Sequence, residues 1–325
     1  MAVPNEGQVI ASAWEAYVKT KPEDQIHDDY WLLNRMSKGA GFKGYDGGRD
    51  FRVPIEYAVN SSVQWYDDTE SFTVARVDVF DEAEFSQKQI VGHVVMSELE
   101  KARNQGSGGK FPLLAQKMEN LKKGMRKAIN EALFSDGTGT SSKEIGGLQH
   151  LVSSTPTTGT VGGINRATFS FWRNQQTSGA KTSTSFDNLR ASMRSIHNLS
   201  AIGVGGAGPV YWVTTRTVFE GYESLLTQNE RFDMKDKRKA ADLGYNNDTL
   251  QFKEATIAFD QDCPSGCAYA INPEFLKLAY LNGYWMKGFP AVDPANATID
   301  VFKVMTIANL VATQPRRLGV VTAIT

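Results

Sequence analysis

The order of its blocks is the feature that most constrains this chain. A long stretch in which apolar residues alternate with polar ones, residues 51–96, comes early, and one amphipathic helix, residues 111–134, follows it. A mixed α/β segment comes next, and the chain ends on a long strand, residues 298–311, and a short terminal one. A hairpin placed this early has too little chain around it to cover both of its faces. We therefore expect neighbouring copies to cover it, which favours an assembly protein over a solitary enzyme.

Composition excludes several classes of protein. The 325 residues carry 35 basic and 36 acidic side chains, so the net charge of −1 lacks the basic excess of a chain that grips nucleic acid through its phosphates. The two cysteines, Cys263 and Cys267, lack the two-residue spacing of redox and zinc pairs; we predict a turn between two strands, with buried thiols, in a reducing compartment. No apolar run approaches about 18 residues and no signal-peptide order is present, so we expect a soluble protein made in a cytoplasm.

The N-terminal part is predicted to be an arm followed by an extended hairpin. Apolar groups within residues 7–36 predict two short helices, and the glycine-rich residues 38–48 predict a hinge. From residue 51 the apolar period is two, which predicts a half-buried strand. One face of this strand carries Phe51, Val53, Ile55, Tyr57 and Val59.

The rest of the hairpin is predicted from the same period. A second strand is expected at residues 72–80, with a bulge where its apolar phase slips between Val74 and Val77. Residues 83–96 are expected to continue extended. The turn between the strands, residues 66–70, is polar and expected to be exposed.

The helix predicted at residues 111–134 would be about 35 Å long and would act as a structural spine. Its apolar residues are spaced by three or four, whereas basic side chains, among them Lys122 and Arg126, cover the remaining surface. Gly137 follows its predicted end. A second glycine-rich turn, residues 104–110, precedes the helix and is a second predicted hinge.

The second half of the chain is predicted to be a small mixed α/β domain followed by strands. A helix starting near residue 185, a strand at residues 210–214 and a helix around residues 218–226 give a helix–strand–helix order. The charged residues 229–247 predict a loop. Further strands are expected at residues 250–259, 268–271, 298–311 and 318–324. The fold class predicted for the whole chain is therefore α+β.

Motifs for catalysis or cofactor binding are not found. The glycine-rich string at residues 203–208 follows a helix and precedes a strand, which is the reverse of a dinucleotide-binding fingerprint, so it predicts a turn. The four histidines are His27, His93, His150 and His197, and none has a Gly-x-Ser-x-Gly or His-Glu-x-x-His context. We predict no catalytic, metal-binding or cofactor-binding residue, although a site assembled from distant residues stays open.

Two groups of charged residues have competing interpretations. The acidic run Asp67, Asp68 and Glu70 lacks the spacing of a calcium loop and is expected to be a solvated hairpin edge, where charge discourages stray strand pairing. The alternative is a contact with the basic spine helix of a neighbouring subunit. Arg316 and Arg317 suit either a phosphate or an acidic neighbour, and the near-neutral net charge favours the subunit contact.

Several strings carry a resemblance to a known family. Residues 130–139 read Asn-Glu-Ala-Leu-Phe-Ser-Asp-Gly-Thr-Gly, and residues 145–148 read Ile-Gly-Gly-Leu. Gly-Gly-Ile-Asn-Arg at 162–166 and Phe-Trp-Arg-Asn at 171–174 follow, and Pro-Arg-Arg-Leu-Gly-Val-Val lies at 315–321. With the block order, these strings make the chain resemble the major capsid proteins of tailed bacteriophages with the HK97 fold. The resemblance covers nearly the whole chain, and its motifs are diagnostic of structure, not of catalysis.

The resemblance implies four parts. These are an N-terminal arm (1–46), an extended E-loop hairpin (47–96), a P-domain (97–140 and 263–325, with the spine helix at about 111–134) and an A-domain (141–262). It also implies that hexamers and pentamers of the chain tile an icosahedral shell around packaged double-stranded DNA, and that a rounder precursor matures into an angular shell. The implied location is the virion capsid, assembled in the bacterial cytoplasm, without a membrane.

The implied partners are other copies of the chain, with scaffolding, portal and decoration proteins and non-specific contact with DNA. Some members of the family carry an N-terminal scaffolding region of about a hundred residues. Here the hairpin starts too soon for one, so we expect a separate scaffolding protein or none. Some members cross-link a hairpin lysine to a neighbour's asparagine; no motif marks Lys43 or Lys88 for this bond, and we do not predict it.

The residues expected to serve assembly fall into two sets. The predicted hinges are Gly44, Gly47, Gly48, Gly106, Gly108 and Gly109. The predicted inter-subunit contacts are Phe51, Val53, Ile55, Tyr57, Asp67, Asp68, Lys122, Arg126, Arg316 and Arg317. The competing functions are another phage structural protein, such as a portal, tail, decoration or surface-layer protein, and a soluble hydrolase or nucleotide-binding protein. The spine helix with its α/β neighbour disfavours a tail tube, and the missing motifs disfavour the enzyme.

Overall fold

The computed structural model describes residues 30–71, 74, 76–103, 113–178, 188–202, 206–227, 250–294 and 298–324. These residues form two compact units. The large unit contains residues 30–88, 130–282 and 308–324, and the small unit contains residues 89–129 and 283–307. The units differ from the four parts that the resemblance implies, and that four-part division stays a prediction.

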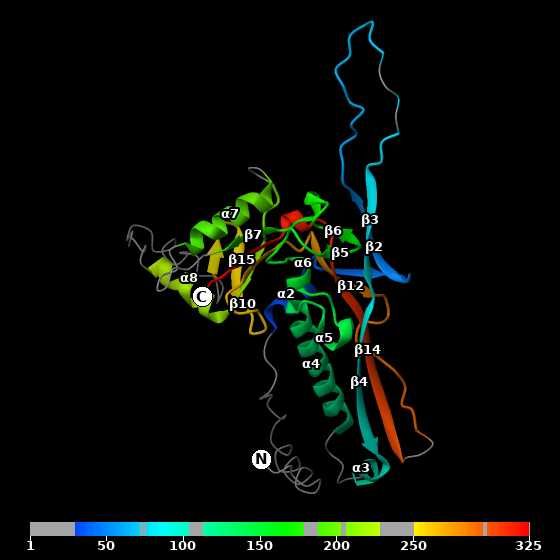
Figure 1. Cartoon of the computed structure of the whole chain (residues 1–325). Helices are drawn as coiled ribbons and strands as arrows, with labels where there is room; N and C mark the ends of the chain where they lie inside the picture. Colours follow the sequence, from blue (N-terminus) through cyan, green and yellow to red (C-terminus); the bar gives the residue numbers. More distant parts are fainter. Residues whose placement is uncertain are drawn as a thin grey trace. The chain divides into compact units, whose positions relative to one another are not determined.

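The large unit contains a six-stranded mixed sheet (Figure 1). Its strands, in spatial order, are β7 (Gln175–Ser178), β15 (Gly319–Thr322), β11 (Ala268–Ile271), β8 (Tyr211–Thr214), β10 (Ala255–Phe259) and β9 (Leu250–Phe252). β8 is parallel to β10 and antiparallel to β11. The predicted strands at residues 210–214 and 268–271 are confirmed. The predicted strand at residues 250–259 is a tight hairpin of two strands, because Lys253 adopts a φ of 54° between them.

Two helices, α7 (Leu189–Ala201) and α8 (Arg216–Thr227), form the core with this sheet. The buried cluster contains residues of both helices and of the sheet, among them Met193, Ile196, Tyr222 and Trp212. The predicted helix–strand–helix order is confirmed. Leu199 of α7 is half exposed, because the buried stripe continues from Ile196 to Ser200.

A second sheet is organised around the long strand β14 (Ile299–Ala312). In the large unit, β1 (Phe42–Tyr45) is parallel to β12 (Leu276–Leu281), which is antiparallel to the C-terminal end of β14. In the small unit, β13 (Lys287–Gly288) and β4 (Lys88–Ser97) pair with β14. The predicted strand at residues 298–311 is confirmed, whereas β1 and β12 were not predicted.

An antiparallel pair, β2 (Asp50–Glu56) and β3 (Phe80–Ser86), forms the base of an extended hairpin. We call these strands and the residues between them the arm, and its described residues between 57 and 79 the arm tip. The arm tip extends far beyond the paired strands (Figure 1). The predicted strand at residues 72–80 is wrong, because the described residues before Phe80 are irregular. Two strands without a third to pair with are only marginally stable, which fits the early end of the pairing.

The spine helix is confirmed as α4 (Leu113–Phe134); its predicted first two residues lie outside the described ones. It ends where predicted, since Gly137 adopts a φ of 75°. Of the two helices expected in the N-terminal arm, the second is α2 (Trp31–Lys38) and the first lies outside the described residues. The remaining elements are α3 (Glu98–Arg103), α5 (Gly139–Ser142), α6 (Leu148–Leu151), β5 (Thr160–Val161), β6 (Ile164–Asn165), η2 (Ser170–Trp172) and η4 (Pro315–Arg317).

Candidate assembly surfaces

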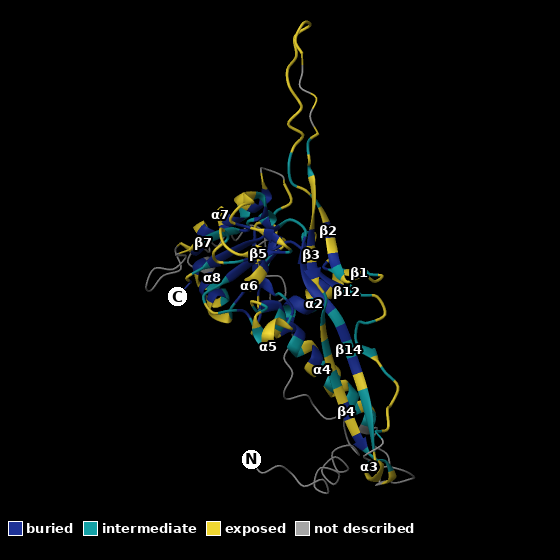
Figure 2. Ribbon diagram, turned by 45° about the vertical axis from the view of Figure 1, so that its right-hand side comes forward, coloured by how far each residue is buried: buried dark blue, intermediate teal, exposed yellow. Residues whose placement is uncertain are grey.

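The arm tip exposes apolar side chains to solvent. Trp65 is fully exposed (101%), and Val59 and Val74 are each 87% exposed. Figure 2 shows most of the tip in the colour of exposed residues, whereas buried and exposed residues alternate along the paired strands at its base. Scattered exposed apolar residues are ordinary, but a contiguous apolar extension marks an interaction surface. The arm tip is therefore the first candidate assembly surface.

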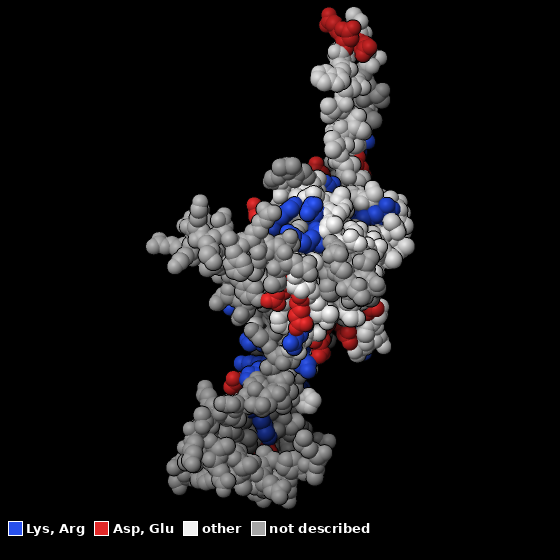
Figure 3. All heavy atoms as spheres, turned by 90° about the vertical axis from the view of Figure 1, so that its left-hand side faces the viewer, with Lys and Arg blue, Asp and Glu red and all other residues white. Residues whose placement is uncertain are grey.

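Acidic residues follow the exposed aromatic ones at the tip. Asp67 organises a turn, because its Oδ1 accepts a hydrogen bond from the Asp68 amide at 2.9 Å and its carbonyl accepts one from the Glu70 amide at 3.0 Å. Figure 3 shows the acidic side chains gathered at this end of the molecule. The predicted exposure of this turn is confirmed. The tip therefore combines a large aromatic side chain with concentrated negative charge.

The base of the arm is covered by the chain itself. Phe51 and Val53 are buried, and the Phe51 ring lies 5.0 Å from the ring of Tyr45. On the partner strand, Ala83 and Phe85 pack so tightly against Gly162 that a Cβ there would lie 3.0 Å from each. Phe51 and Val53 were expected to contact a neighbouring subunit, and this is corrected: residues distant in sequence already enclose them.

Ile55 and Tyr57 are half-buried and mark the border between base and tip. The Tyr57 hydroxyl donates to the Asp78 carbonyl at 3.0 Å, and its ring stacks on that of Phe171 at 5.8 Å. On the solvent face of the base, Arg52 lies 3.1 Å from Glu82 and 2.8 Å from Glu84. Glu82 and Glu84 are thus paired within the arm. A contact of Ile55 and Tyr57 with a neighbour stays a prediction.

The small unit contains a groove between β4 and α4, with a volume of about 480 Å³. We call it the basic groove. It is lined by His93, Val94 and Val95 of β4 and by Gln116, Lys117, Asn120 and Leu121 of α4. The two elements approach closely at Gly92, where a Cβ would lie 2.5 Å from Cδ1 of Leu121. On the same helix, Lys122 and Arg126 are exposed, as predicted.

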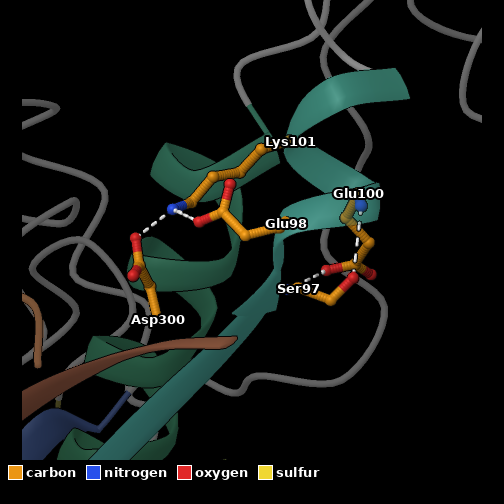
Figure 4. A network of polar contacts seen from close by, with 5 residues as sticks. All are labelled: Ser97, Glu98, Glu100, Lys101 and Asp300. Atoms are coloured by element: carbon orange, nitrogen blue, oxygen red, sulfur yellow. Dashed lines mark hydrogen bonds and ion pairs between the residues drawn. The ribbon is translucent and has the colours of Figure 1, made fainter. Parts of the chain in front are cut away.

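A polar network fixes the end of β4 in the small unit (Figure 4). The Ser97 Oγ accepts a hydrogen bond from the Glu100 amide at 3.2 Å, and the Glu100 carboxylate accepts one from the Ser97 amide at 3.3 Å. This reciprocal pair is a capping box, which satisfies two amides at the start of α3. Glu100 also accepts from the Lys117 ammonium at 3.0 Å, which ties α3 to the wall of the basic groove.

Lys101 extends this network to β14. Its ammonium donates to the Asp300 carboxylate and to the Glu98 carboxylate, the latter at 2.5 Å. The hydrogen bond to Asp300, and then the one to Glu98, raises the pKa of Lys101. The Ser97-x-x-Glu100 pattern was visible in the sequence and was not used to predict this corner.

Several predicted site residues serve the fold of the large unit instead. The Arg317 guanidinium donates to the carbonyls of Ala201 and Ala207, at 2.9 and 3.0 Å, and lies 5.4 Å from the ring centre of Phe275. Arg317 therefore satisfies carbonyls at the end of α7, and its contact with a neighbour stays a prediction. Arg316 instead lines a hollow of about 670 Å³ on the same unit, with Arg173, and its role in assembly stays a prediction.

Of the predicted hinge glycines, one is explained by close packing and two stay hinge candidates. Gly44 lies in β1, opposite Tyr280, and a Cβ there would lie 2.1 Å from Oδ1 of Asn282, so close packing explains this glycine better than flexibility does. Gly47 and Gly48 have φ values of 132° and 99°, which favour glycine, and they stay hinge candidates. Gly106, Gly108 and Gly109 lie outside the described residues.

The motif residues that carry the resemblance hold loops together. Arg166 is buried and donates to the carbonyls of His150 and Leu151, at 3.2 Å for His150, and burial lowers the pKa of its guanidinium to about 10. The Trp172 indole donates to the Val161 carbonyl at 2.9 Å. Asn174 bonds both the amide and the carbonyl of Ser153. These motifs are therefore structural, as the sequence predicted.

The cysteines and two of the histidines are partly or fully buried in the described part of the chain. Both cysteines are free and lie in the predicted turn; Cys263 is buried and Cys267 half-buried, and burial raises the pKa of both thiols. Burial lowers the pKa of His150 and of His197. Within the described residues no three His, Cys, Asp or Glu side chains group as metal ligands would, and no helix has the length and apolarity to span a bilayer.

Solved structures match this chain over nearly its whole length. A capsid chain of cyanophage A-1(L) matches with a TM-score of 0.68 and 15% identity, over 94% of this chain and 97% of that one. A capsid chain of Myoviridae phage XM1 matches with a TM-score of 0.60 and 12% identity, over 94% and 97% of the two chains. The chain has the HK97-like capsid fold.

Chains with the HK97-like fold also form encapsulins. The chain of the holo-SrpI encapsulin complex from Synechococcus elongatus PCC 7942 matches with a TM-score of 0.61 and 8% identity, over 99% of this chain and 96% of that one. No protein-family model and no curated protein matches the sequence. The fold confirms the predicted α+β class with its extended hairpin, long helix and mixed α/β part.

Proposed function

We propose that this chain is the major capsid protein of a tailed bacteriophage. Its copies assemble into hexamers and pentamers that close an icosahedral shell around packaged double-stranded DNA, and it has no catalytic activity. The observation that carries the proposal is the arm tip, which leaves apolar side chains such as Trp65 fully exposed in a single chain. The HK97-like fold, shared with phage capsid chains, supports it.

The arm tip of one copy packs on the spine helix of its neighbour. Asp67 and Asp68 face the exposed Lys122 and Arg126 of that helix, and the apolar side chains of the tip, among them Trp65, become covered in the same contact. Fully burying one large apolar side chain stabilises the contact by about 1.5–3 kcal/mol. Each copy both offers a tip and accepts one, so many weak contacts sum to a stable shell.

The shell also needs bending between five-fold and six-fold positions. Gly47 and Gly48 precede β2, at the point where the chain enters the arm, and their positive φ values make this turn the best described hinge. Gly106, Gly108 and Gly109 are the second proposed hinge. The protein is made in the bacterial cytoplasm and resides in the virion, with scaffolding, portal and decoration proteins as partners and without a cofactor.

A charge exchange tests the contact between copies. Asp67→Lys with Asp68→Lys places four positive groups at the interface and should abolish shells, observed by electron microscopy. Adding Lys122→Glu and Arg126→Glu to the same chain should restore them, because the complementary charges have only changed places. The control moves the new lysines to the base of the arm, as Glu82→Lys with Glu84→Lys, two positions that pair with Arg52. Combined with Lys122→Glu and Arg126→Glu, this control variant should not form shells. Failure of the first exchange to restore shells would contradict this contact.

A second candidate is an encapsulin-type shell, which the match to the SrpI encapsulin complex favours. The two functions differ in what the particle encloses. Nuclease-treated particles from infected or induced cells should contain protected DNA of a uniform length if the chain is a phage capsid protein. Particles without protected DNA would favour the encapsulin-type shell.

A further inference from the structure

A short turn after the spine helix has an unusual backbone. Thr140, Ser141 and Ser142 adopt φ values of 47°, 58° and 62° in succession. We call these three residues the Thr140 turn. Left-handed backbone is unfavourable for any residue with a Cβ, and three such residues in a row are held only by their surroundings.

Lys88 provides part of what holds the turn. Its ammonium donates a hydrogen bond of 2.6 Å to the carbonyl of Ser142. Within the turn, the Thr140 hydroxyl donates to the Glu144 carboxylate at 2.8 Å, and the Ser142 amide donates to the Thr138 carbonyl at 3.3 Å. The contact from Lys88 comes from another part of the chain, 54 residues away.

Lys88 occupies a special place in the arm. It is the first residue of β4 and lies two residues after the end of β3 at Ser86, and the first segment of the large unit, residues 30–88, ends at it. The neighbouring residues are held as well: the Asn309 side-chain amide donates to the Ser86 carbonyl at 2.7 Å, and the Gln87 side-chain amide donates to the Gly48 carbonyl at 2.9 Å. A hollow of about 290 Å³, lined by Lys88, Asp136, Ser142 and His150 among others, gives the side chain room to move away.

We propose that the Thr140 turn is a strained clasp that fixes the base of the arm through Lys88. The strain makes the clasp reversible: when Lys88 leaves the Ser142 carbonyl, the turn relaxes to right-handed backbone, and the base of the arm gains freedom to change its angle. In the intact protein this links a bend of the arm to the loop that follows the spine helix. The clasp is a property of the single chain, and its use in a changing shell rests on the proposed function.

The strain is tested by two substitutions at one exposed residue. Ser141→Gly and Ser141→Ala remove the same side chain, but only glycine adopts left-handed backbone freely. In ordinary helical or extended backbone the alanine variant is the more stable one. A clasp in the left-handed conformation reverses this order, so the glycine variant of the full chain should unfold at the higher temperature. A higher unfolding temperature for the alanine variant would overturn the proposal.

The coupling to Lys88 is tested by hydrogen exchange of the full chain. Lys88→Met should speed exchange in residues 138–146 and in β3 about tenfold, whereas Lys143→Met, which removes the same charge from an exposed neighbour in the loop, should leave it unchanged. Combining Lys88→Met with Ser141→Gly should give less than the sum of the two effects, because glycine removes the strain that Lys88 holds. Equal effects of the two lysine variants, or strictly additive effects, would overturn the proposal. Neither measurement depends on shells, so this result is independent of the capsid assignment.

Discussion

The side-chain amide of Asn130 donates a hydrogen bond of 3.0 Å to the buried carboxylate of Asp260. The same carboxylate accepts from the backbone amide of Leu32 at 3.2 Å and from that of Asp262 at 3.2 Å. The end of the spine helix, the first turn of α2 and the turn after β10 therefore meet at one acidic group. All three donors are neutral, and burial raises the pKa of Asp260 above its ordinary value.

A pH dependence of stability follows from this carboxyl group. The pKa of Asp260 is higher in the folded state than in the unfolded state, where it is 3.8, so protonation of this carboxyl group stabilises the fold. The stabilisation is complete below pH 3.8 and is lost as the pH rises through the folded pKa. The free energy of unfolding of the wild type, minus that of Asp260→Asn, should fall across this window by at most about 1.4 kcal/mol per pH unit. Denaturant unfolding at a series of pH values measures it.

Asp136 is the matched control with the opposite sign. Hydrogen bonds from the Thr138 amide and hydroxyl lower its pKa, so its contribution is present above the unfolded pKa and is lost as the pH falls through the folded one. The difference between wild type and Asp136→Asn should therefore shrink toward acid pH. The same direction of change for both residues would contradict the two assignments.

Gly147 is expected to tolerate no side chain. A Cβ there would lie 2.3 Å from the Ala132 carbonyl oxygen and 2.7 Å from that of Leu133, and these backbone atoms belong to the end of α4. Gly147→Ala should lower the free energy of unfolding by about 3 kcal/mol. Gly124→Ala, in the same helix, is the control. No atom of another described segment lies within 4 Å of its Cβ position, and the change should raise stability by about 0.5–1 kcal/mol. Thermal unfolding of both variants measures the difference in sign.

The capping box at Ser97 should contribute measurably to the small unit. Ser97→Ala removes the acceptor for the Glu100 amide and should cost about 1 kcal/mol. Ser97→Thr retains a hydroxyl that can cap the helix and should cost much less. Hydrogen exchange of α3 reports the local effect directly, and equal exchange in the two variants would show that the cap contributes nothing.

Replacing the hinge glycines should separate folding from assembly. Proline requires a φ near −65°, which neither Gly47 at 132° nor Gly48 at 99° has. Gly47→Pro with Gly48→Pro should block shells and leave subunits whose circular dichroism and thermal unfolding resemble those of the wild type, because the turn is exposed. Normal shells from this double variant would contradict the hinge.

The sequence correctly predicts the helices and strands that show a clear apolar periodicity within their own residues. The spine helix, β8, β11 and β14 follow from apolar periodicity, and the glycine at residue 137 correctly marks the end of the helix. β12 was missed because Leu276, Leu278 and Ala279 are all buried, which removes the alternation that reveals a strand covered on one face.

Contacts between distant segments could not be predicted. The period-two pattern shows that Phe51 and Val53 need cover, but it does not show that the cover comes from the chain itself, through Tyr45 and the packing around Gly162. The two arginines near the C-terminus look alike in sequence, and only the structure shows that Arg317 caps α7. The composition of the arm tip, by contrast, correctly predicted an exposed acidic turn.

Electron microscopy of the expressed chain, with light scattering of the same sample, tests the central claim most directly. The chain is expressed alone and together with the genes beside its own. We predict closed particles tens of nanometres across in at least one of the two preparations, and their loss with Trp65→Ser, which removes the fully exposed aromatic side chain of the arm tip. Subunits of 35.8 kDa or small rings in both preparations would contradict the claim that this chain builds a shell.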